Sequence, residues 1–333
     1  MDFNRKIFYI AKKLHEEKPF DLAHHVTYST WRVGSPLWRL GIPFIWGPIS
    51  GTEIFPLISF GSMLSTSAKA FELLRVLGGL TSRISNEVRL CAKHAFHIFA
   101  AHSEAVTQLA ELRGSKNGIS VLSYYAFDRA TIASFERPTF QMTNDPLNIL
   151  AGGNLEGRKG IAIALNGLAI ARKQGAEFLF NVTGRGPELE YLLKLSAALG
   201  LDKHVTIGQA FPRNEYVSRL RETDIYLLPS LREGGGLTMM EAMLAGCVPI
   251  VANCGGPGTA VTDDCGFRIA VQSPDQMAND IASSIMCLYH NRDLLQTMGR
   301  KAANRISTTY AQENFLKTIQ AIYETARNIN CKQ

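Results

Sequence analysis

Two carboxylates on either side of a helix start are the residues of this chain best suited to chemistry. Glu233 precedes three consecutive glycines, and Glu241 follows eight residues later, in the first turns of a predicted helix at residues 238–245. The free N–H groups and the positive dipole end of that helix would lie between them. Such a helix end binds phosphate, while carboxylates beside it accept hydrogen bonds from hydroxyls. This layout suits a sugar nucleotide, which joins a sugar, a diphosphate and a ribose diol.

The same segment also has a purely structural interpretation. An apolar strand at residues 226–228, a glycine turn, a helix, a second apolar strand at 248–251 and a second glycine turn occur in any doubly wound α/β sheet. Glu233 and Glu241 would then be surface glutamates. Composition alone favours neither interpretation over the other.

The residues themselves resemble the donor-site motif of retaining family 4 glycosyltransferases. That motif is usually E-G-x-G-L, with a second Glu eight positions after the first. Residues 233–237 read Glu-Gly-Gly-Gly-Leu, residues 241–243 read Glu-Ala-Met, and Gly255-Gly256 follows where the family has a second glycine pair. The resemblance extends over roughly the last three quarters of the chain and more thinly up to Phe20.

The resemblance implies a role for each residue of this donor site. Glu233 would position the donor sugar and stabilise positive charge, and Glu241 would bind the ribose diol. Lys159 matches a family Lys that grips the donor diphosphate together with an Arg five residues earlier. Asn154 stands at the position of that Arg and offers a hydrogen bond without a charge. Arg158 is a candidate to supply the missing positive charge, and Lys159 could instead be a solvated loop residue.

The remaining predicted donor-site residues lie in turns. They are Gly235, Gly236, Leu237 and Thr238 at the helix start, and Gly184 in a Gly-x-Gly turn similar to those that hold the nucleotide base. No metal or other cofactor is expected, because protein cations and the helix dipole would balance the diphosphate and no Asp-x-Asp motif is present.

The fold that the resemblance implies is α/β and of the GT-B type, with two facing Rossmann-like, doubly wound domains. We expect an acceptor-side domain at residues 1–143, a donor-binding domain at 144–308, and a last helix within 309–333 that crosses back to the first domain. The first domain is expected to lack its first strands, so that an apolar edge at residues 22–26 is left unpaired.

Apolar periodicity predicts the elements that position these residues. In the first domain we expect a helix at 3–17, strands at 20–26, 40–46, 96–101 and 119–123, helices within 56–93, a helix at 104–112 capped by Ser103, and a linker at 137–146. In the second we expect strands at 147–151, 178–183, 204–208, 226–228 and 248–251, and helices after 160 and at 188–199, 238–245, 275–289, 292–306 and 312–328.

Three polar residues of the first domain are further candidates. His24 and His25 end a predicted strand and should therefore point to opposite faces. One of them could contact a sugar hydroxyl, or both could be structural. A few relatives have a catalytically relevant His after the next strand, where this chain has Gly47-Pro48, so that role does not carry over. Glu53, just after a glycine turn, is a further candidate residue for the cleft between the two expected domains.

Composition bounds the class of protein. No apolar run reaches the length of a membrane span, no secretory signal is visible, and the six cysteines lack zinc or redox spacing. Together these features favour a cytoplasmic protein with reduced thiols.

Net charge is +6, and residues 1–140 hold 16 basic against 11 acidic residues. This excess is either a scattered solvated surface or a face for anionic lipid or a phosphorylated acceptor. Nucleic acid is not expected, because basic and aromatic residues do not interleave.

The expected activity is retaining transfer of a sugar from a nucleotide-diphosphate sugar to a glycan or lipid-linked acceptor, in cell-surface polysaccharide or lipid-linked glycan synthesis, with peripheral contact at the inner face of the membrane as a further expectation. The alternative is a GT-B protein that binds nucleotide sugars with little or no transfer. A hydrolase leaves Lys159 and the glycine turn unexplained. A sugar-nucleotide epimerase is disfavoured by the spacing of Glu233 and Glu241.

Overall fold

The computed structural model describes residues 2–137 and 146–330, which form two compact units. The first unit contains the chain up to Ile54, Glu72–Ala126 and the chain from Gln312. The second contains Phe55–Phe71 and Phe127–Ala311. Each unit is built on a parallel sheet, which confirms the α/β class. The linker predicted at 137–146 lies almost entirely outside the described residues.

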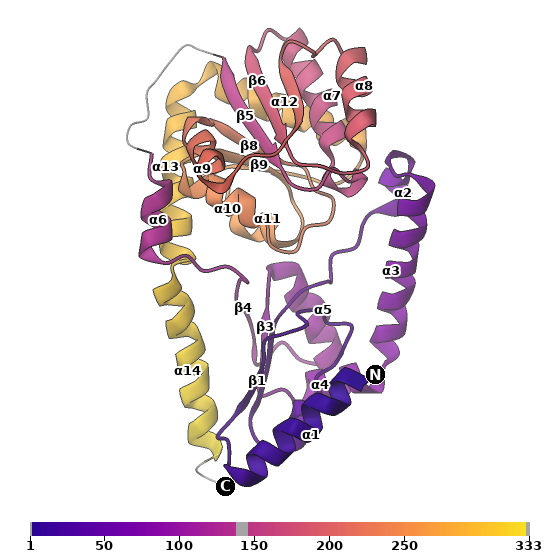
Figure 1. The fold of residues 1–333 in the computed structure, drawn as a ribbon, viewed down its shortest axis with the longest axis vertical. Helices are drawn as coiled ribbons and strands as arrows, with labels where there is room; N and C mark the ends of the chain where they lie inside the picture. The colour runs from indigo at the N-terminus through magenta and orange to yellow at the C-terminus, as the bar shows by residue number, and fades with distance from the viewer. Residues whose placement is uncertain (1, 138–145, 331–333) are drawn as a thin grey trace. The chain divides into compact units, whose positions relative to one another are not determined.

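The second unit has a six-stranded sheet in the order β10-β9-β8-β5-β6-β7 (Figure 1). Its strands are β5 (Leu147–Gly152), β6 (Phe178–Thr183), β7 (Val205–Gln209), β8 (Ile225–Leu228), β9 (Val248–Ala252) and β10 (Phe267–Ile269). The chain starts in the middle at β5, moves outward to β7, and then reverses to continue from β8 on the other side of β5. In such sheets ligands bind outside the carboxyl ends of the strands at the reversal.

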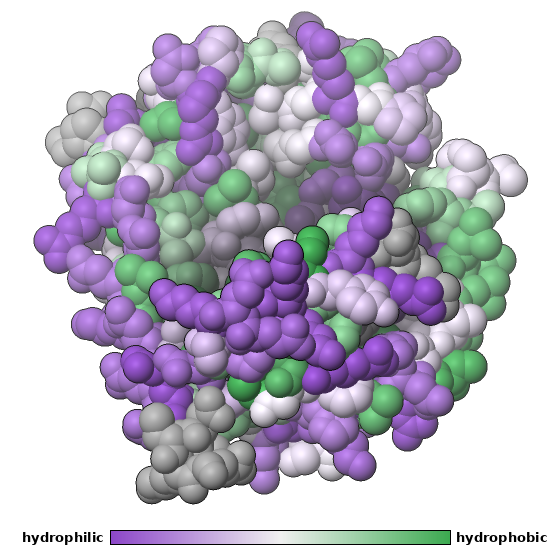
Figure 2. All heavy atoms as spheres, turned by 60° about the horizontal axis from the view of Figure 1, so that its bottom comes forward, coloured by the Kyte–Doolittle hydropathy of each residue, from purple (hydrophilic) through white to green (hydrophobic). Residues whose placement is uncertain are grey.

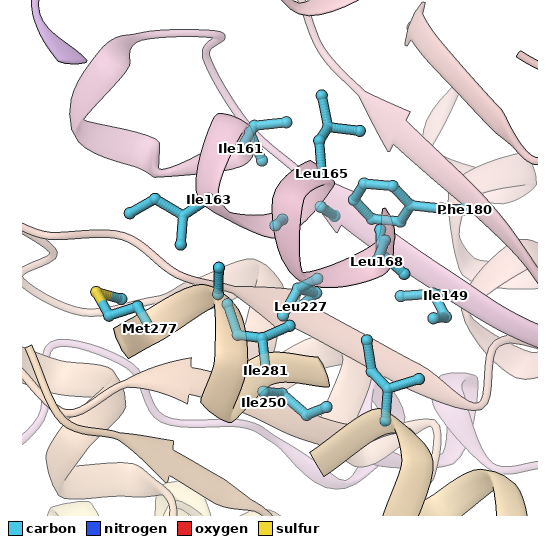
Figure 3. Packing of buried hydrophobic residues seen from close by; sticks show 14 of the residues in the cluster. Ile149, Ile161, Ile163, Leu165, Leu168, Phe180, Leu227, Ile250, Met277 and Ile281 are labelled. Carbon is cyan, nitrogen blue, oxygen red and sulfur yellow. The ribbon is translucent and has the colours of Figure 1, made fainter. Parts of the chain in front are cut away.

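Helices cover both faces of this sheet. The helices that follow Ala126 in this unit are α6 (Arg129–Phe135), which packs on α9 and α10, and α7 (Ile161–Lys173), α8 (Leu189–Ala198), α9 (Arg213–Glu222), α10 (Leu237–Leu244), α11 (Gly255–Ala260), α12 (Pro274–His290) and α13 (Arg292–Thr309), with the 3₁₀ turn η3 at Gly157–Lys159. Figure 3 shows how α7 and α12 pack on the strands. Ile163 and Leu168 of α7 meet Ile281 of α12 and Leu227 of β8, and this fixes the strand ends that carry the loops described below.

The second unit also contains a segment that is separated in sequence from the rest of it, and this segment completes its core. Residues 55–71 include α2 (Leu57–Phe60), the 3₁₀ turn η2 (Gly61–Met63) and Leu64, which is buried in the same apolar cluster as the β5–α7 packing. A Cβ placed on Gly157 would lie 2.7 Å from Leu64 Cδ2. Leu64 therefore packs against the turn that precedes Lys159.

Replacing Leu64 tests this packing. Leu64→Ala is expected to lower the free energy of opening of the second unit by about 2–4 kcal/mol, because it leaves a cavity under the 157–159 turn. Native-state hydrogen exchange of β5 and α7 measures the change. The matched control is Leu193→Ala, which alters an exposed leucine of α8. Equal protection factors in the two variants would show that Leu64 is not part of this core.

The first unit has a four-stranded parallel sheet in the order β1-β2-β3-β4, with β1 at the edge as predicted. Its strands are β1 (Ala23–His25), β2 (Phe44–Ile49), β3 (His97–Ala100) and β4 (Ile119–Val121). Its helices are α1 (Asp2–Glu17), the part of α3 (Thr66–Ile84) from Glu72 onward, α4 (Asn86–His94), α5 (Ser103–Arg113) and α14 (Gln312–Asn330), with the 3₁₀ turn η1 (Pro36–Leu40). One sheet face packs on α4 and α5, and the other on α14.

Several predicted details were wrong or missing. Ser103 does not cap its helix; His102 precedes α5 and its ring accepts a hydrogen bond from the N–H of Ala105. The second glycine turn is the short helix α11, whose residues 255–260 include three glycines. Helices α6 and α9 and strand β10 were not predicted, since they are short and lack a clear apolar period.

His24 is a structural residue of the first unit. Its Nε2 lies 2.8 Å from the carbonyl oxygen of Gly47, and its Nδ1 lies 2.7 Å from the hydroxyl of Tyr323 in α14. Because a carbonyl can only accept, Nε2 donates and Nδ1 accepts. Burial lowers the pKa of His24, and the bond to Gly47 opposes this shift. The ring therefore ties β1 to β2 and to α14. His25 is buried beside it.

Candidate donor-nucleotide site

The loops after β5, β6 and β8 meet at the carboxyl edge of the second sheet, where the chain reverses. Gly184 has a φ of +143°, and a Cβ there would lie 1.9 Å from the carbonyl oxygen of Gly153. Only glycine allows this approach of the β5 and β6 turns. The N–H of Leu231 donates to the carbonyl of Arg158 at 2.9 Å, which joins the β5 loop to the β8 loop. The result is a small recess lined by Gly153, Asn154 and Lys159 among others.

Lys159 and Glu233, which lie 74 residues apart in sequence, form an ion pair in this place. The Nζ of Lys159 lies 2.5 Å from Oε2 of Glu233, and the two side chains are 13% and 18% exposed. A Lys ammonium has three donors, so it can hold a phosphate oxygen while it still holds the carboxylate. The low exposure makes the attraction stronger than it would be in bulk water. The two main residues of the predicted donor site are therefore in direct contact.

Gly160 sets the position of this pair. It has a φ of +67°, and a Cβ there would lie 2.2 Å from the carbonyl oxygen of Pro229, at the start of the β8 loop. The close approach brings Lys159 beside the loop that carries Glu233. A side chain at position 160 would separate the two loops.

Gly160→Ala is therefore expected to weaken nucleotide-sugar binding by about tenfold or more, because a displacement of about 1 Å at such a site is costly. The matched control is Gly200→Ala, at a φ of +70° with no atom within 4 Å of the added Cβ. That control carries the same backbone strain, about 1–2 kcal/mol, without the clash. Calorimetric titration with a nucleotide sugar compares the two, and similar affinities would remove Gly160 from the site.

Two residues could take over the contacts of the missing arginine, and they are placed differently. Asn154 is exposed at the recess. The guanidinium of Arg158 is bound to neighbouring protein groups. Its Nε donates to Glu156 at 2.6 Å, and its Nη1 donates to the carbonyl of Arg232 at 3.2 Å. Arg158 thus braces the backbone next to Glu233. Its contact with a diphosphate stays a prediction.

Helix α10 begins four residues after Glu233. Gly236, with a φ of +77°, is its N-cap, and Leu237 and Thr238 form its first turn. The turn that includes Gly235 is held by a hydrogen bond of 3.1 Å from the N–H of Gly256 to the carbonyl of Glu233. The N–H groups at the start of α10 have no partner inside the helix, and their contact with an anion stays a prediction.

Glu241 has a partner that sequence reasoning missed. Its Oε1 lies 2.7 Å from Nη2 of Arg213, at the start of α9. The Glu241 side chain is 5% exposed, whereas Arg213 is 61% exposed. The hydrogen bond that Arg213 donates to this carboxylate raises the pKa of Arg213 further above its usual value, so the guanidinium stays charged. The sequence carried no signal for this contact, because α9 was not predicted.

Two buried hydroxyls at the end of β8 were also missed. Burial raises the pKa of Tyr226 to about 12, and the carboxylates of Glu233 and Glu241 act in the same direction. Tyr226 therefore interacts electrostatically with both predicted site glutamates, and its hydroxyl stays neutral. The hydroxyl of Ser230 is buried and has no hydrogen-bond partner within residues 2–137 and 146–330. An orphaned hydroxyl at the carboxyl edge of a strand is a candidate ligand contact.

The first unit has its own polar cluster at the carboxyl ends of β2 and β3. The carboxylate of Glu53 accepts hydrogen bonds from Ser50 Oγ, at 2.9 Å, and from Nε2 of His102. Burial works to raise the pKa of Glu53, but the bonds from His102 and Ser50 outweigh it and hold the pKa below its usual range. Both side chains are buried. Sequence reasoning proposed Glu53 but not His102.

A family model and several curated proteins match this chain. The model of the family described as Glycosyl transferases group 1 matches residues 134–305. The amylovoran biosynthesis glycosyltransferase AmsK of Erwinia amylovora is 36% identical over 117 residues, covering 33% of this chain and 28% of that protein. The putative colanic acid biosynthesis glycosyltransferase WcaL of Escherichia coli (strain K12) is 25% identical over 176 residues, covering 50% and 42%. The chain thus spans less than half the length of these curated relatives.

Some solved structures resemble the chain over nearly its whole length. Anabaena Alr3699/HepE in complex with UDP has a TM-score of 0.66 at 14% identity and covers 95% of this chain and 81% of that one. The lipopolysaccharide outer core galactosyltransferase WaaB has a TM-score of 0.64 at 17% identity, covering 97% and 80%. At such identities the likeness concerns the fold alone, and it confirms the GT-B prediction.

Proposed function

The chain belongs to the glycosyl transferases group 1 family, and on that premise we propose that it transfers a sugar from a nucleotide-diphosphate sugar to an acceptor hydroxyl with retained anomeric configuration. The observation that carries the proposal is the Lys159–Glu233 pair at the reversal of the second sheet, beside the start of α10. A cation, a helix end and a carboxylate in one place suit a diphosphate joined to a sugar.

In the proposed reaction the bond between the anomeric carbon and the diphosphate breaks, and a bond to the acceptor oxygen forms. The acceptor proton leaves with the diphosphate. Lys159 and the N–H groups of α10 stabilise the negative charge on the leaving diphosphate. Glu233 stabilises the positive charge that develops on the sugar, and Glu241 binds the ribose diol. Asn154 and Arg158 add contacts to the diphosphate, and no metal is needed in this scheme.

The setting of the reaction is proposed from the relatives. AmsK and WcaL are named for amylovoran and colanic acid biosynthesis, which supports a glycan or lipid-linked acceptor in surface polysaccharide synthesis. Alr3699/HepE binds UDP, which supports a nucleotide-sugar donor. We place the protein in the cytoplasm, with peripheral contact at the inner face of the membrane.

One observation favours a second candidate function. Asn154 stands where the resembled family has an arginine, so the diphosphate would be held with one cation fewer. A protein with this site could bind nucleotide sugars and transfer them slowly or not at all.

Release of nucleoside diphosphate from UDP-, GDP- and ADP-sugars, with water as the acceptor, tests both candidates. The first predicts slow release from one donor, an NMR product of retained configuration, and a rate that EDTA leaves unchanged. Calorimetric binding without any release, also in the presence of extracted membrane glycolipids, would favour the second. Inverted product would contradict the retaining mechanism.

A further inference from the structure

Within the first unit, helix α3 has its polar residues on the buried side and its apolar residues on the exposed side. From Glu72 to Ile84 its inner face carries charged and small residues: Glu72 is buried, Arg75 lies 3.8 Å from it in an ion pair, and a Cβ on Gly79 would lie 3.6 Å from Trp31. An ordinary surface helix places its apolar residues there instead. The apolar residues of α3 must therefore serve something other than the core of this unit.

Those apolar residues form one outward row, which we call the α3 stripe: Leu73, Leu74, Leu77, Leu80 and Ile84, exposed by 48% to 76%. Figure 2 shows hydrophobic side chains gathered on the side formed by α3, at the right of the view. Four of the five recur at intervals of four, three and four residues, which is the spacing of one helix face. Contiguous apolar surface of this kind marks an interaction site.

A basic pocket begins where the stripe ends. A cavity of about 410 Å³, which we call the arginine pocket, lies between α1, η1 and the start of α4, and its lining includes Ser85, the residue after Ile84. Three arginines line it, Arg5, Arg32 and Arg39, against one acid, Glu87, which pairs with Arg39 at 2.5 Å. A guanidinium group can donate two parallel hydrogen bonds to the oxygens of one phosphate.

Two exposed residues of α1 extend this surface. Tyr9 also lines the arginine pocket and is 70% exposed, and its neighbour Ile10 is 61% exposed. Tyrosine is enriched where a protein meets the boundary between water and lipid, because its ring is apolar and its hydroxyl is polar.

The charges decide between two possible occupants of this surface. A second copy of the chain, docked stripe to stripe, would cover the leucines but would bring no phosphate or other anion from its own stripe to the arginine pocket. An anionic lipid surface offers acyl chains to the α3 stripe and phosphates to the arginines, so it complements both parts. Basic residues near such a surface contribute about 1 kcal/mol each, whereas neutral lipid gains nothing from them.

We propose that the α3 stripe and the arginine pocket together form a docking surface for an anionic phospholipid membrane, with one lipid phosphate held in the pocket. The proposal rests on the proposed function for the membrane contact itself and adds the surface and the lipid chemistry. No helix among residues 2–137 and 146–330 is long and apolar enough to cross a membrane. The α3 helix would therefore lie in the interface plane, with its leucines inserted and its charges facing the protein.

Vesicle sedimentation tests the proposal. The chain is expected to bind vesicles of equal parts phosphatidylglycerol and phosphatidylcholine, and to bind pure phosphatidylcholine at least about tenfold more weakly. Leu77→Gln combined with Leu80→Gln should weaken binding to the anionic vesicles by about tenfold or more, since two leucines no longer enter lipid. Arg5→Gln should reduce the preference for anionic over neutral vesicles and its dependence on salt.

The matched control is Leu193→Gln, because Leu193 is an exposed leucine of the second unit with 47% exposure. Calorimetric nucleotide-sugar binding by every variant keeps this test separate from the proposed function, since none of these residues lies in the donor site. The proposal is overturned if the parent chain does not bind anionic vesicles, or if the stripe variant binds them as Leu193→Gln does. It is also overturned if light scattering shows that the parent chain is a dimer and the stripe variant a monomer with unchanged vesicle binding.

Discussion

Lys159→Met is expected to lower the rate of nucleoside diphosphate release by about 10²–10³-fold, the loss typical of removing one preorganised electrostatic contact in a transition state. The change removes the cation that lies 2.5 Å from Glu233 and leaves that mostly buried carboxylate unpaired. It also leaves the departing diphosphate without its main positive charge. Steady-state kinetics with the donor that binds measures the effect, and kcat should fall more than the donor KM rises.

Lys194→Met is the matched control for this prediction. Lys194 forms an ion pair of 2.7 Å with Glu190 in the same unit, but both side chains are more than two-thirds exposed. Surface pairs of this kind contribute little to stability or function. If the two lysine variants turned over at similar rates, the leaving-group role of Lys159 would be refuted.

Glu241→Ala is expected to weaken nucleotide-sugar affinity by about 10–100-fold, because the two hydroxyls of a ribose diol would lose a charged acceptor. The effect should appear in the dissociation constant more than in kcat, since the ribose is remote from the bond that breaks. Calorimetric titration measures it. Glu215→Ala is the control, because Glu215 pairs with Arg219 at 3.0 Å on the exposed face of α9.

Arg213→Ala separates a ligand contact of Glu241 from a purely structural one. Glu241 Oε1 accepts from Arg213, which is itself largely exposed. A ribose contact predicts that Arg213→Ala keeps most of the affinity that Glu241→Ala loses. If both variants lost affinity equally, Glu241 would act only by holding Arg213, and the assignment of the ribose site would be wrong.

The sequence indicated which residues the donor-site prediction concerns, but not which other residues they contact in the fold. Glu233 and Glu241 belong to one motif with fixed spacing and Lys159 to another, and the structure brings Lys159 into contact with Glu233. Arg213 could not, because it starts a helix with little apolar periodicity and reaches Glu241 only through the folded chain. The contacts of Arg158 with Glu156 and with the backbone likewise depend on the loop geometry.

Core membership was harder to predict than secondary structure. The helical character of residues 56–93 was correct, but periodicity does not say which sheet a helix covers. Leu64 packs in the second unit, whereas the leucines of α3 from Leu73 onward face outward. A similar limit applies to the cap of α5: Ser is a common N-cap, but here the ring of His102 reaches the N–H of Ala105.

Calorimetric titration of UDP-, GDP- and ADP-sugars into the chain shows whether the Lys159–Glu233 pair and α10 form a nucleotide-sugar site. We predict micromolar binding of the sugars of one nucleotide, unchanged in Leu193→Gln and weakened at least about tenfold in Glu241→Ala. That result would confirm the site and name the base. No binding of any of the three by a chain that is folded by circular dichroism would contradict the account.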